Sequence, residues 1–213
     1  MRIIGIDPGI RNTGWAVVQL DSAVDCLLGA GVVYTVPYKG AGHRLRCEDY
    51  IERLGAIQDG LRMAVEEHKP NLAMVEGIAG SKSSSAAIGM ALGFAASVLT
   101  MREAGLEPIT MLASQVRSML PNIESTSTKK AKGYTRDVVR GRFGEVATDK
   151  AMEGVTRGRQ EHAYDAAGLI VAGLRHPAVE WARRWEMRGD YDADEQANRV
   201  REALDLRGRI KSG

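Results

Sequence analysis

Among the side chains of types that bind divalent metal ions, four stand at positions where the fold is expected to bring them together. Asp7 and Glu76 each end a short apolar run, and His162 and Asp165 are three residues apart in a helical pattern. A separation of three places His162 and Asp165 on one helix face, one turn apart. Functional groups of parallel α/β sheets gather at the carboxyl ends of strands. We therefore expect all four side chains to converge on one site.

Such a cluster would be unfavourable without a cation. Two carboxylates about 4 Å apart repel by about 1 kcal/mol in water, and by about 4 kcal/mol at an effective dielectric constant of about 20. An oxygen-rich site with little sulfur favours Mg²⁺ or Mn²⁺ over zinc, and one imidazole moves the balance toward Mn²⁺. Two such ions about 4 Å apart would activate a water molecule and stabilise the leaving oxygen of a phosphodiester.

Each of these residues also has a simpler structural interpretation. Asp7 precedes Pro8 and Gly9, and Asp-Pro-Gly is common in turns. Glu76 could point outward from a strand end, and Asp165 could be a charge on a solvated helix face. A single histidine such as His162 is more often a surface or core residue than a ligand. Only the combination of the four favours a functional site.

The elements that must position these residues follow from the hydrophobic periodicity. Two apolar runs separated by Gly, Pro and Asn predict an antiparallel hairpin, and the later alternation of strands and helices predicts parallel strands. The predicted strands are residues 2–6, 15–18, 31–36, 72–77 and 109–112. The predicted helices are residues 45–68, 83–105, a short one capped by Ser114, one from Thr135 to about 143, and 161–176, with a polar loop at 121–133. The expected fold is α/β, a mixed five-stranded sheet with helices on both faces.

Composition restricts the class of protein only loosely. The 213 residues fit one domain with a small appendage, and 29 basic against 27 acidic residues neither suggest nor exclude a nucleic-acid partner. Cys26 and Cys47 do not form a C-x-x-C pair, so we expect reduced thiols in a cytosolic protein and no thiolate metal site.

No membrane or export signal is expected. The N-terminal apolar run reaches a carboxylate at Asp7, too early for a secretory signal. Residues 83–101 are uncharged and nominally long enough to cross a bilayer, but they open with three serines and are rich in Ala and Gly. We expect them to form a helix that is buried on nearly all sides.

Four segments carry a resemblance to a known family. Residues 5–18 (GIDPGIRNTGWAVV) look like the opening motif of the RuvC family of Holliday-junction resolvases. Residues 74–77 (MVEG) are similar to the second catalytic strand of that family, and residues 162–167 (HAYDAA) resemble its closing acidic helix. Residues 114–117 (SQVR) resemble the stretch between them. The matches spread over roughly residues 1–176.

The resemblance implies an RNase H-like fold, a homodimer, and metal-dependent, paired symmetric cutting of four-way DNA junctions in recombination and repair. It assigns Asp7, Glu76, His162 and Asp165 to a catalytic metal site with two Mg²⁺ or Mn²⁺ ions, and makes Asp7 the shared ligand. It leaves open whether His162 is a ligand or helps to deprotonate the attacking water. Glu161 is the less favoured ligand. A branch-migration helicase is a further partner compatible with the resemblance, in a cytoplasmic setting.

The sequence departs from the family at the point where many members carry an aromatic residue shortly after the second acid. Residues 77–82 contain no aromatic side chain, and Ile78 is the apolar residue nearest to that place. Two alternatives therefore stay open: a nuclease with broad specificity for branched or flap DNA, and a catalytically silent junction-binding protein. A nucleotide phosphotransferase of the ASKHA type begins similarly, but its later phosphate motifs cannot be located.

A local excess of positive charge predicts the DNA-binding surface. Residues 114–142 contain seven basic and two acidic side chains, which suits a surface that tracks phosphates, although such runs are often only solubilising. Lys82 and Ser83 precede a predicted helix, whose N-terminal N–H groups favour phosphate. The predicted DNA-binding residues are Lys82, Ser83, Arg117, Lys129, Lys130, Lys132 and Arg136.

The chain is expected to divide at residue 177. Residues 1–177 would form the nuclease domain, and residues 178–213 are rich in charge, which predicts a solvated helical C-terminal extension rather than more core. Trp181 and Trp185 could dock this extension on its own core, which we favour, or on a partner subunit.

Overall fold

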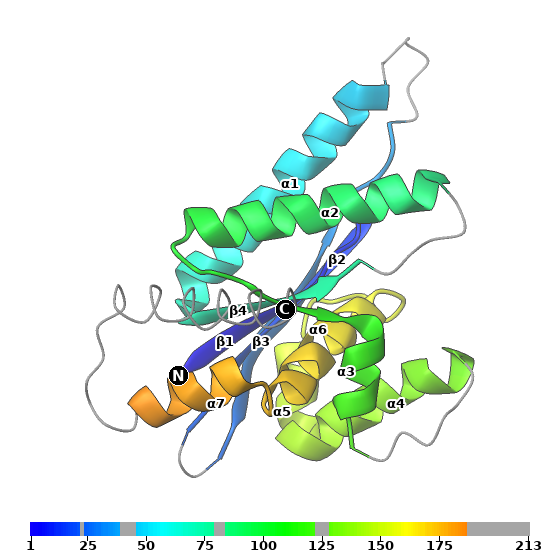
Figure 1. The fold of residues 1–213 in the computed structure, drawn as a ribbon. Coiled ribbons are helices and arrows are strands. Elements are labelled where there is room, and N and C mark those ends of the chain that lie inside the picture. The colour runs from blue at the N-terminus through cyan, green and yellow to red at the C-terminus, as the bar shows by residue number, and fades with distance from the viewer. Residues whose placement is uncertain (22–23, 39–45, 79–83, 122–127, 187–213) are drawn as a thin grey trace, which may run out of the picture.

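The computed structural model describes residues 1–21, 24–38, 46–78, 84–121 and 128–186. These residues form five strands and seven helices (Figure 1). In chain order they are β1 (Arg2–Asp7), β2 (Asn12–Gln19), β3 (Cys26–Tyr34), α1 (Arg46–His68), β4 (Leu72–Gly77), α2 (Ser84–Glu103), β5 (Ile109–Leu112), α3 (Ala113–Met119), α4 (Thr128–Phe143), α5 (Glu145–Ala151), α6 (Gln160–Gly173) and α7 (Pro177–Glu186).

The five strands form one mixed sheet in the order β3-β2-β1-β4-β5. Strand β2 pairs antiparallel with both β1 and β3, and β1, β4 and β5 run parallel. The short, apolar, β-branched strand β1 therefore lies in the middle of the sheet, flanked by β2 and β4. The expected mixed five-stranded sheet is confirmed.

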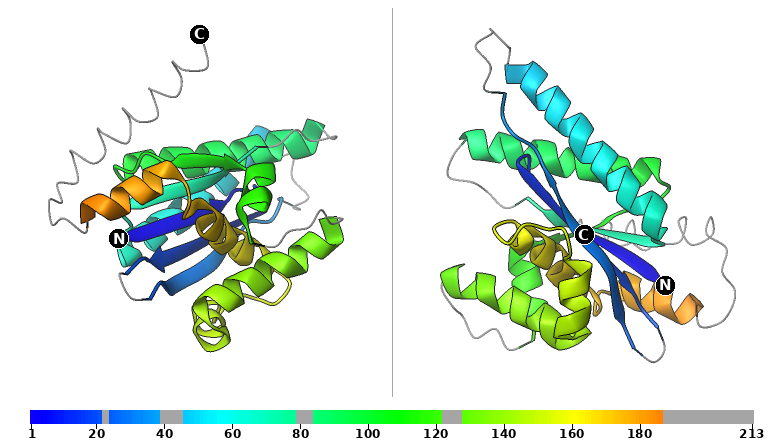
Figure 2. Two further views of the ribbon diagram at one scale, coloured as in Figure 1. Left: turned by 60° about the horizontal axis from the view of Figure 1, so that its bottom comes forward. Right: turned by 180° about the vertical axis from the view of Figure 1, so that it is seen from behind.

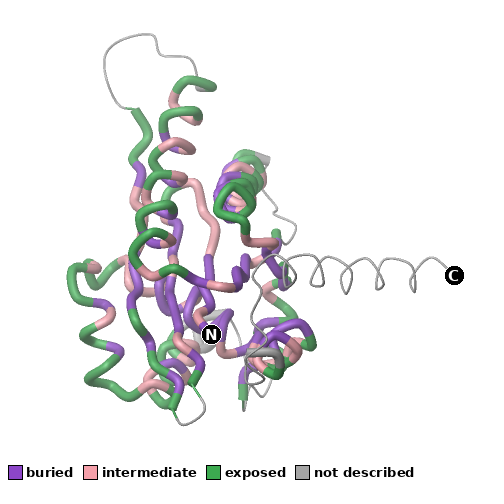
Figure 3. Tube along the Cα trace, turned by 90° about the vertical axis from the view of Figure 1, so that its left-hand side faces the viewer, coloured by how far each residue is buried: buried purple, intermediate pink, exposed green. Residues whose placement is uncertain are grey.

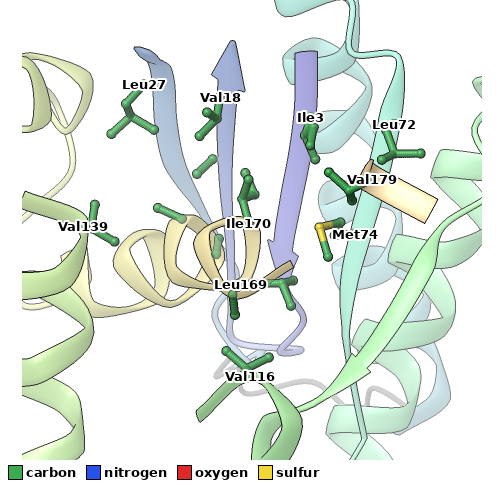
Figure 4. Packing of buried hydrophobic residues seen from close by; sticks show 14 of the residues in the cluster. Ile3, Val18, Leu27, Leu72, Met74, Val116, Val139, Leu169, Ile170 and Val179 are labelled. Atoms are coloured by element: carbon green, nitrogen blue, oxygen red, sulfur yellow. The ribbon is translucent and has the colours of Figure 1, made fainter. Parts of the chain in front are cut away.

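Helices cover both faces of this sheet (Figure 2). On one face α1 and α2 pack over a cluster that includes Ile4, Ile6, Ile57 and Met101. On the other face α6 lies directly on β1 and β2, surrounded by α3, α4, α5 and α7 (Figure 4). Successive residues of a strand point to opposite faces, and each inner strand is accordingly apolar on both.

Several element boundaries differ from those that the sequence predicts. Strand β3 begins at Cys26, five residues before the expected start, because it pairs with β2 along nearly its whole length. Helix α3 begins at Ala113, so Ser114 is not its N-cap; the Gln115 side chain instead accepts a hydrogen bond from the Leu112 N–H at 2.8 Å. Helix α4 begins at Thr128, so Thr135 lies inside the helix rather than at its start.

The expectation that α2 is buried on nearly all sides is wrong. Its inner face packs on α1 and β4, but Ile88 and Leu99 on its outer face are 48% and 53% exposed (Figure 3). The segment Ser85–Glu103 is long and apolar enough to cross a membrane by length and composition alone, and a third of its most apolar window is buried inside the protein. A helix of this kind in a sheet-packed layer is weak evidence for a membrane span.

The described part of the C-terminal extension is not a solvated helix. In α7, Ala178, Val179 and Ala182 are buried in the same core as α6, and Trp181 packs against that core. The spacing of its apolar residues gives α7 one apolar face, and Val179 on that face lies beside Ile3, Leu72 and Met74 of β1 and β4 (Figure 4). The Trp185 side chain and residues 187–213 lie outside the described part, and the division of the chain at residue 177 stays a prediction.

Candidate active site at the ends of β1 and β4

Strand alternation places Asp7 and Glu76 on the same face of the sheet. In β1, Ile3 faces the α6 side, and Ile4 and Ile6 face the α1–α2 side. Asp7 therefore shares the face of Ile3, because it is an even number of residues away. The same counting from Met74 puts Glu76 on the α6 side of β4. Since Ile6 pairs with Val75 in the parallel register, the two carboxylates lie on neighbouring strands, one residue beyond that pair.

Helix α6 reaches this strand end because glycines let its backbone touch the sheet. A Cβ atom on Gly14 would overlap the carbonyl oxygen of His162, and one on Gly5 would overlap that of Ala166. Gly14 pairs with Asp7 in the β1–β2 hairpin. The first turns of α6 are thus held against the residue that carries the first carboxylate. Gly5 and Gly14 belong to the motif around Asp7, but nothing in the sequence marks them as the contact points of a helix.

His162 is hydrogen-bonded to Asp7 across the contact between α6 and β1. The Nδ1 atom of His162 lies 2.8 Å from the Oδ2 atom of Asp7, and both side chains are mostly buried. This bond is the largest cause of a raised His162 pKa, and the charges of Asp7, Glu161 and Asp165 add to it, whereas desolvation opposes it. The imidazole thus faces a predominantly acidic site.

Glu76 is a largely buried carboxylate whose pKa is raised. Burial is the largest cause, and the charges of Asp7 and Asp165 add to it, raising the pKa of Glu76 to about 7. Arg117 on α3 opposes this rise. Asp7, Asp165 and Arg117 are therefore close enough to Glu76 to act on its charge, and the four predicted site residues converge.

Glu161 lies at the edge of this cluster. Its Oε1 atom is 3.9 Å from the Nε2 atom of His162, and its side chain is 42% exposed. Asp165, one turn after His162, is half-buried and influences the pKa values of both Glu76 and His162. The helix therefore turns Asp165 inward and leaves Glu161 on the rim, as the sequence spacing predicts.

The chemical types of these side chains suit a divalent cation better than any protein partner. Three carboxylates and one imidazole gather where the nearest cationic side chain, Arg117, offsets the rise in the Glu76 pKa only in part. Among the described residues no three His, Cys, Asp or Glu side chains have the arrangement of a metal site. Asp7 and His162 instead bind each other through Oδ2 and Nδ1. The donor set fits such an ion.

The turn that follows Asp7 is fixed from two sides. The Thr13 hydroxyl donates to the Gly9 carbonyl at 2.8 Å, and α2 approaches so closely at Gly93 that a Cβ atom there would press on the Gly9 backbone. The buried Arg53 of α1 donates to the Ile10 carbonyl at 3.1 Å and to the Thr35 hydroxyl at 2.9 Å. Arg53 was not predicted, and an arginine within an amphipathic helix gives no sequence signal for this role.

The predicted DNA-binding residues are only partly described. Arg117 is exposed beside Glu76, and Arg136 is exposed on α4 with its Nε atom 3.4 Å from Asp137. Two other arginines of the basic segment are paired internally, Arg142 with buried Asp25 and Arg140 with Asp149. Lys82 and Ser83, and the side chains of Lys129, Lys130 and Lys132, lie outside the described part.

Comparison with known proteins identifies relatives named crossover junction endodeoxyribonuclease RuvC. The family model described as "Crossover junction endodeoxyribonuclease RuvC" matches residues 3–134. The protein of that name from Oleidesulfovibrio alaskensis is 36% identical over 86 residues, covering 40% of this chain but only 46% of that relative. The one from Trichlorobacter lovleyi is 27% identical over 195 residues, covering 86% of this chain and 95% of the relative.

Solved structures show the same fold at lower identity. Thermus thermophilus RuvC in complex with a Holliday junction substrate matches with a TM-score of 0.61 at 23% identity, over 82% of this chain and 93% of that one. The yeast mitochondrial Holliday junction resolvase Ydc2 matches with a TM-score of 0.52 at 12% identity, over 96% of this chain and 85% of that one. These likenesses confirm the expected RNase H-like fold.

Proposed function

Because the chain belongs to the RuvC family of crossover junction endodeoxyribonucleases, we propose that it cuts four-way DNA junctions by phosphodiester hydrolysis. Its role would be in DNA recombination and repair, in the cytoplasm. The relatives named above carry this activity in their names, and the residues of this chain supply the corresponding chemistry.

The observation that carries the proposal is the meeting of Asp7, Glu76, His162 and Asp165 at the carboxyl ends of β1 and β4. Each carboxylate raises the cost of ionising Glu76, so the cluster is electrostatically unfavourable on its own. Groups arranged in this way are typical of functional sites rather than of structural ion pairs. A structural role for the cluster would require basic partners in its interior.

We assign the binding of Mg²⁺ or Mn²⁺, as two ions, to Asp7, Glu76, His162 and Asp165. Such ions would supply charge neutralisation at the scissile phosphate and activation of a water molecule. The chain itself orients the donors: the β1–β2 hairpin holds Asp7, β4 holds Glu76, and α6 presents His162 and Asp165. The raised His162 pKa also suits this imidazole to hold a proton close to Asp7.

The finer features of substrate recognition are also proposals. Arg117 lies beside Glu76 and would contact a phosphate near the cut. Ile78 is 39% exposed two residues after Glu76, where it would act as an apolar wedge in the junction. Lys82, Ser83, Lys129, Lys130, Lys132 and Arg136 would extend the phosphate track. A homodimer would present two sites related by a twofold axis for paired cuts, and a branch-migration helicase would be its partner.

The test compares three DNA substrates of the same sequence. A synthetic four-way junction, a Y-fork and a linear duplex are incubated with the full chain and Mg²⁺ or Mn²⁺. Junction resolution predicts symmetric paired nicks in the junction at a much higher rate than in the other two. Equal rates on all three would contradict junction selectivity, and the absence of cutting with either ion would contradict the nuclease proposal.

A further inference from the structure

Two arginines and one tyrosine form a compact group outside the four-residue site. The guanidinium carbon of Arg159 lies 3.3 Å from the centre of the Tyr34 ring. Arg11 and Arg159 both lie close enough to Tyr34 to lower the pKa of its phenol, and Arg11 has the larger effect. None of these three residues stood out in the sequence, because they come from three separate segments.

This group lies on the same sheet face as the carboxylates. Asn12 pairs with Tyr34 across β2 and β3, and Asp7 pairs with Gly14 across β1 and β2. Asn12 and Gly14 are two residues apart and so share a face. Two strand spacings and two residue rises separate the Cα atoms of Tyr34 and Asp7 by roughly 12 Å. The Arg11–Tyr34–Arg159 group therefore lies within about one or two nucleotides' length of Asp7 at the end of β1.

The backbone ties both arginines to the elements that form the site. The Thr35 N–H donates to the Arg11 carbonyl at 3.0 Å, and the His162 N–H donates to the Arg159 carbonyl at 3.1 Å. Arg11 follows Asp7 in the hairpin turn, and Arg159 immediately precedes α6. Any phosphate that these side chains bind is consequently held at a fixed offset from Asp7 and His162.

The charge of this group is not neutralised within the protein. Among the described residues, Arg11 and Arg159 interact with the Tyr34 phenol but form no ion pair with a carboxylate. Other arginines do have such partners, for example Arg53 with Asp49 and Arg62 with Asp59. Two adjacent guanidinium groups without an acid favour an anion, and guanidinium groups match the geometry of phosphate oxygens.

We propose that Arg11 and Arg159, held together by Tyr34, form a phosphate clamp that binds the DNA backbone on the β3 side of the active site. The clamp lies across Asp7 from Arg117, which sits on the β4–β5 side. A DNA strand bound by both would cross the carboxylates between two fixed phosphate contacts. The inference rests on the proposed function for its substrate, and it adds residues that fix the position of the strand.

The test measures how DNA binding depends on salt. Binding of the full chain to a labelled four-way junction and to a linear duplex is followed over a series of KCl concentrations without divalent ions. The variants are R11Q, R159Q and the double variant. The matched control is R175Q, which removes the same charge from an exposed arginine after the far end of α6. Thermal unfolding confirms that each variant is folded.

Each lost phosphate contact should lower the slope of log affinity against log salt by about 0.9. If both arginines hold the same phosphate, the double variant should lose about one such contact rather than two. It should also bind DNA at least several-fold more weakly than R175Q at 50–100 mM salt. A double variant with the slope and affinity of R175Q would overturn the clamp.

A second variant tests the part of Tyr34. Y34F keeps the ring under Arg159 but removes the hydroxyl on which both arginines act. We expect weaker DNA binding, two- to tenfold, with the salt slope nearly retained, because both positive charges remain. Wild-type affinity in Y34F would overturn the bridging role. These binding results are independent of cutting, so a protein that binds through the clamp but does not cut junctions contradicts only the proposed function.

Discussion

The Nδ1 atom of His162 lies 2.8 Å from the Oδ2 atom of Asp7, although the two residues are 155 positions apart in the chain. The bond exists because Gly5 and Gly14 allow the α6 backbone to rest on β1 and β2. In the metal-free protein it gives each side chain a partner inside an acidic cluster. A bound cation and the protons of Glu76 and His162 would use the same side chains, so metal binding and protonation of the site should compete.

Metal affinity should therefore depend on pH. Because Glu76 has a pKa of about 7 and that of His162 is raised, both hold protons at mildly acidic pH. Ligands must be deprotonated to bind a metal, so Mg²⁺ or Mn²⁺ affinity should fall as the pH drops below about 7, by about tenfold per unit for each proton released. Isothermal titration calorimetry at several pH values and in two buffers measures the affinity and the proton release. Affinity that is independent of pH from 5 to 8 would contradict this competition.

Glu76→Gln should stabilise the metal-free protein at high pH. The folded-state pKa of Glu76 is raised above its ordinary value of 4.5, so the folded state binds the proton more tightly than the unfolded state. The free energy of unfolding then falls as pH rises from about 4.5 to about 7, and stays low above that. The variant avoids this loss, which amounts to up to about 3 kcal/mol at pH 8 and to nothing from this source below about pH 4.

Thermal unfolding in EDTA at pH 4 and pH 8 measures that difference. Glu66→Gln changes an exposed glutamate of α1 in the same way and should have little effect at either pH. An equal change of melting temperature for Glu76→Gln at both pH values would show that Glu76 is ionised without penalty.

Gly14→Ala should separate α6 from the strand that carries Asp7. The new Cβ atom would overlap the His162 carbonyl, so the helix must shift, at a cost of about 1–3 kcal/mol. Gly141→Ala is the matched control, because its Cβ atom meets nothing within 4 Å on α4 and alanine should stabilise that helix by about 0.5–1 kcal/mol. Urea unfolding gives both values. Equal stability of the two variants would argue against the close approach.

Arg53→Leu should loosen the turn after Asp7. The substitution removes the donors to the Ile10 carbonyl and the Thr35 hydroxyl in a buried position, which costs about 1–3 kcal/mol. Arg62→Leu removes exposed ion pairs from the same helix and should cost less than about 1 kcal/mol. Chemical unfolding separates the two, and a larger loss for Arg62→Leu would show that Arg53 does not brace the turn.

The candidate site could be predicted from the sequence because its carboxylates follow local rules. Asp7 and Glu76 end apolar strands, and His162 and Asp165 have helical spacing, so periodicity places each pair, although it does not dock α6 on the strand ends. The contacts that depend on three-dimensional packing could not be predicted. The seating of α6 on Gly14, the burial of Val179, and the pairing of Arg11 with Tyr34 each join segments whose separation carries no periodic signal.

The boundaries that were wrong share a cause. Ser114 is a good N-cap residue, but the Gln115 side chain satisfies the first free N–H of that helix and moves its start. Helix α2 is apolar all round, which predicts burial on all sides, yet the sheet and α1 cover only its inner face. In α3 a side chain of the helix itself bonds the N-terminal N–H, and in α2 the surrounding elements decide which face is covered.

The most direct test of the account is the cutting of a synthetic four-way junction by Asp7→Asn in the presence of Mg²⁺ or Mn²⁺. The change removes one negative charge and keeps the side-chain size, and Asp59→Asn on the exposed surface of α1 is its control. The account predicts that Asp7→Asn binds the junction like the wild type but cuts it at least about 10²–10³-fold more slowly, as for loss of a group that stabilises transition-state charge. Cutting by Asp7→Asn at the rate of Asp59→Asn would contradict the assignment of the active site.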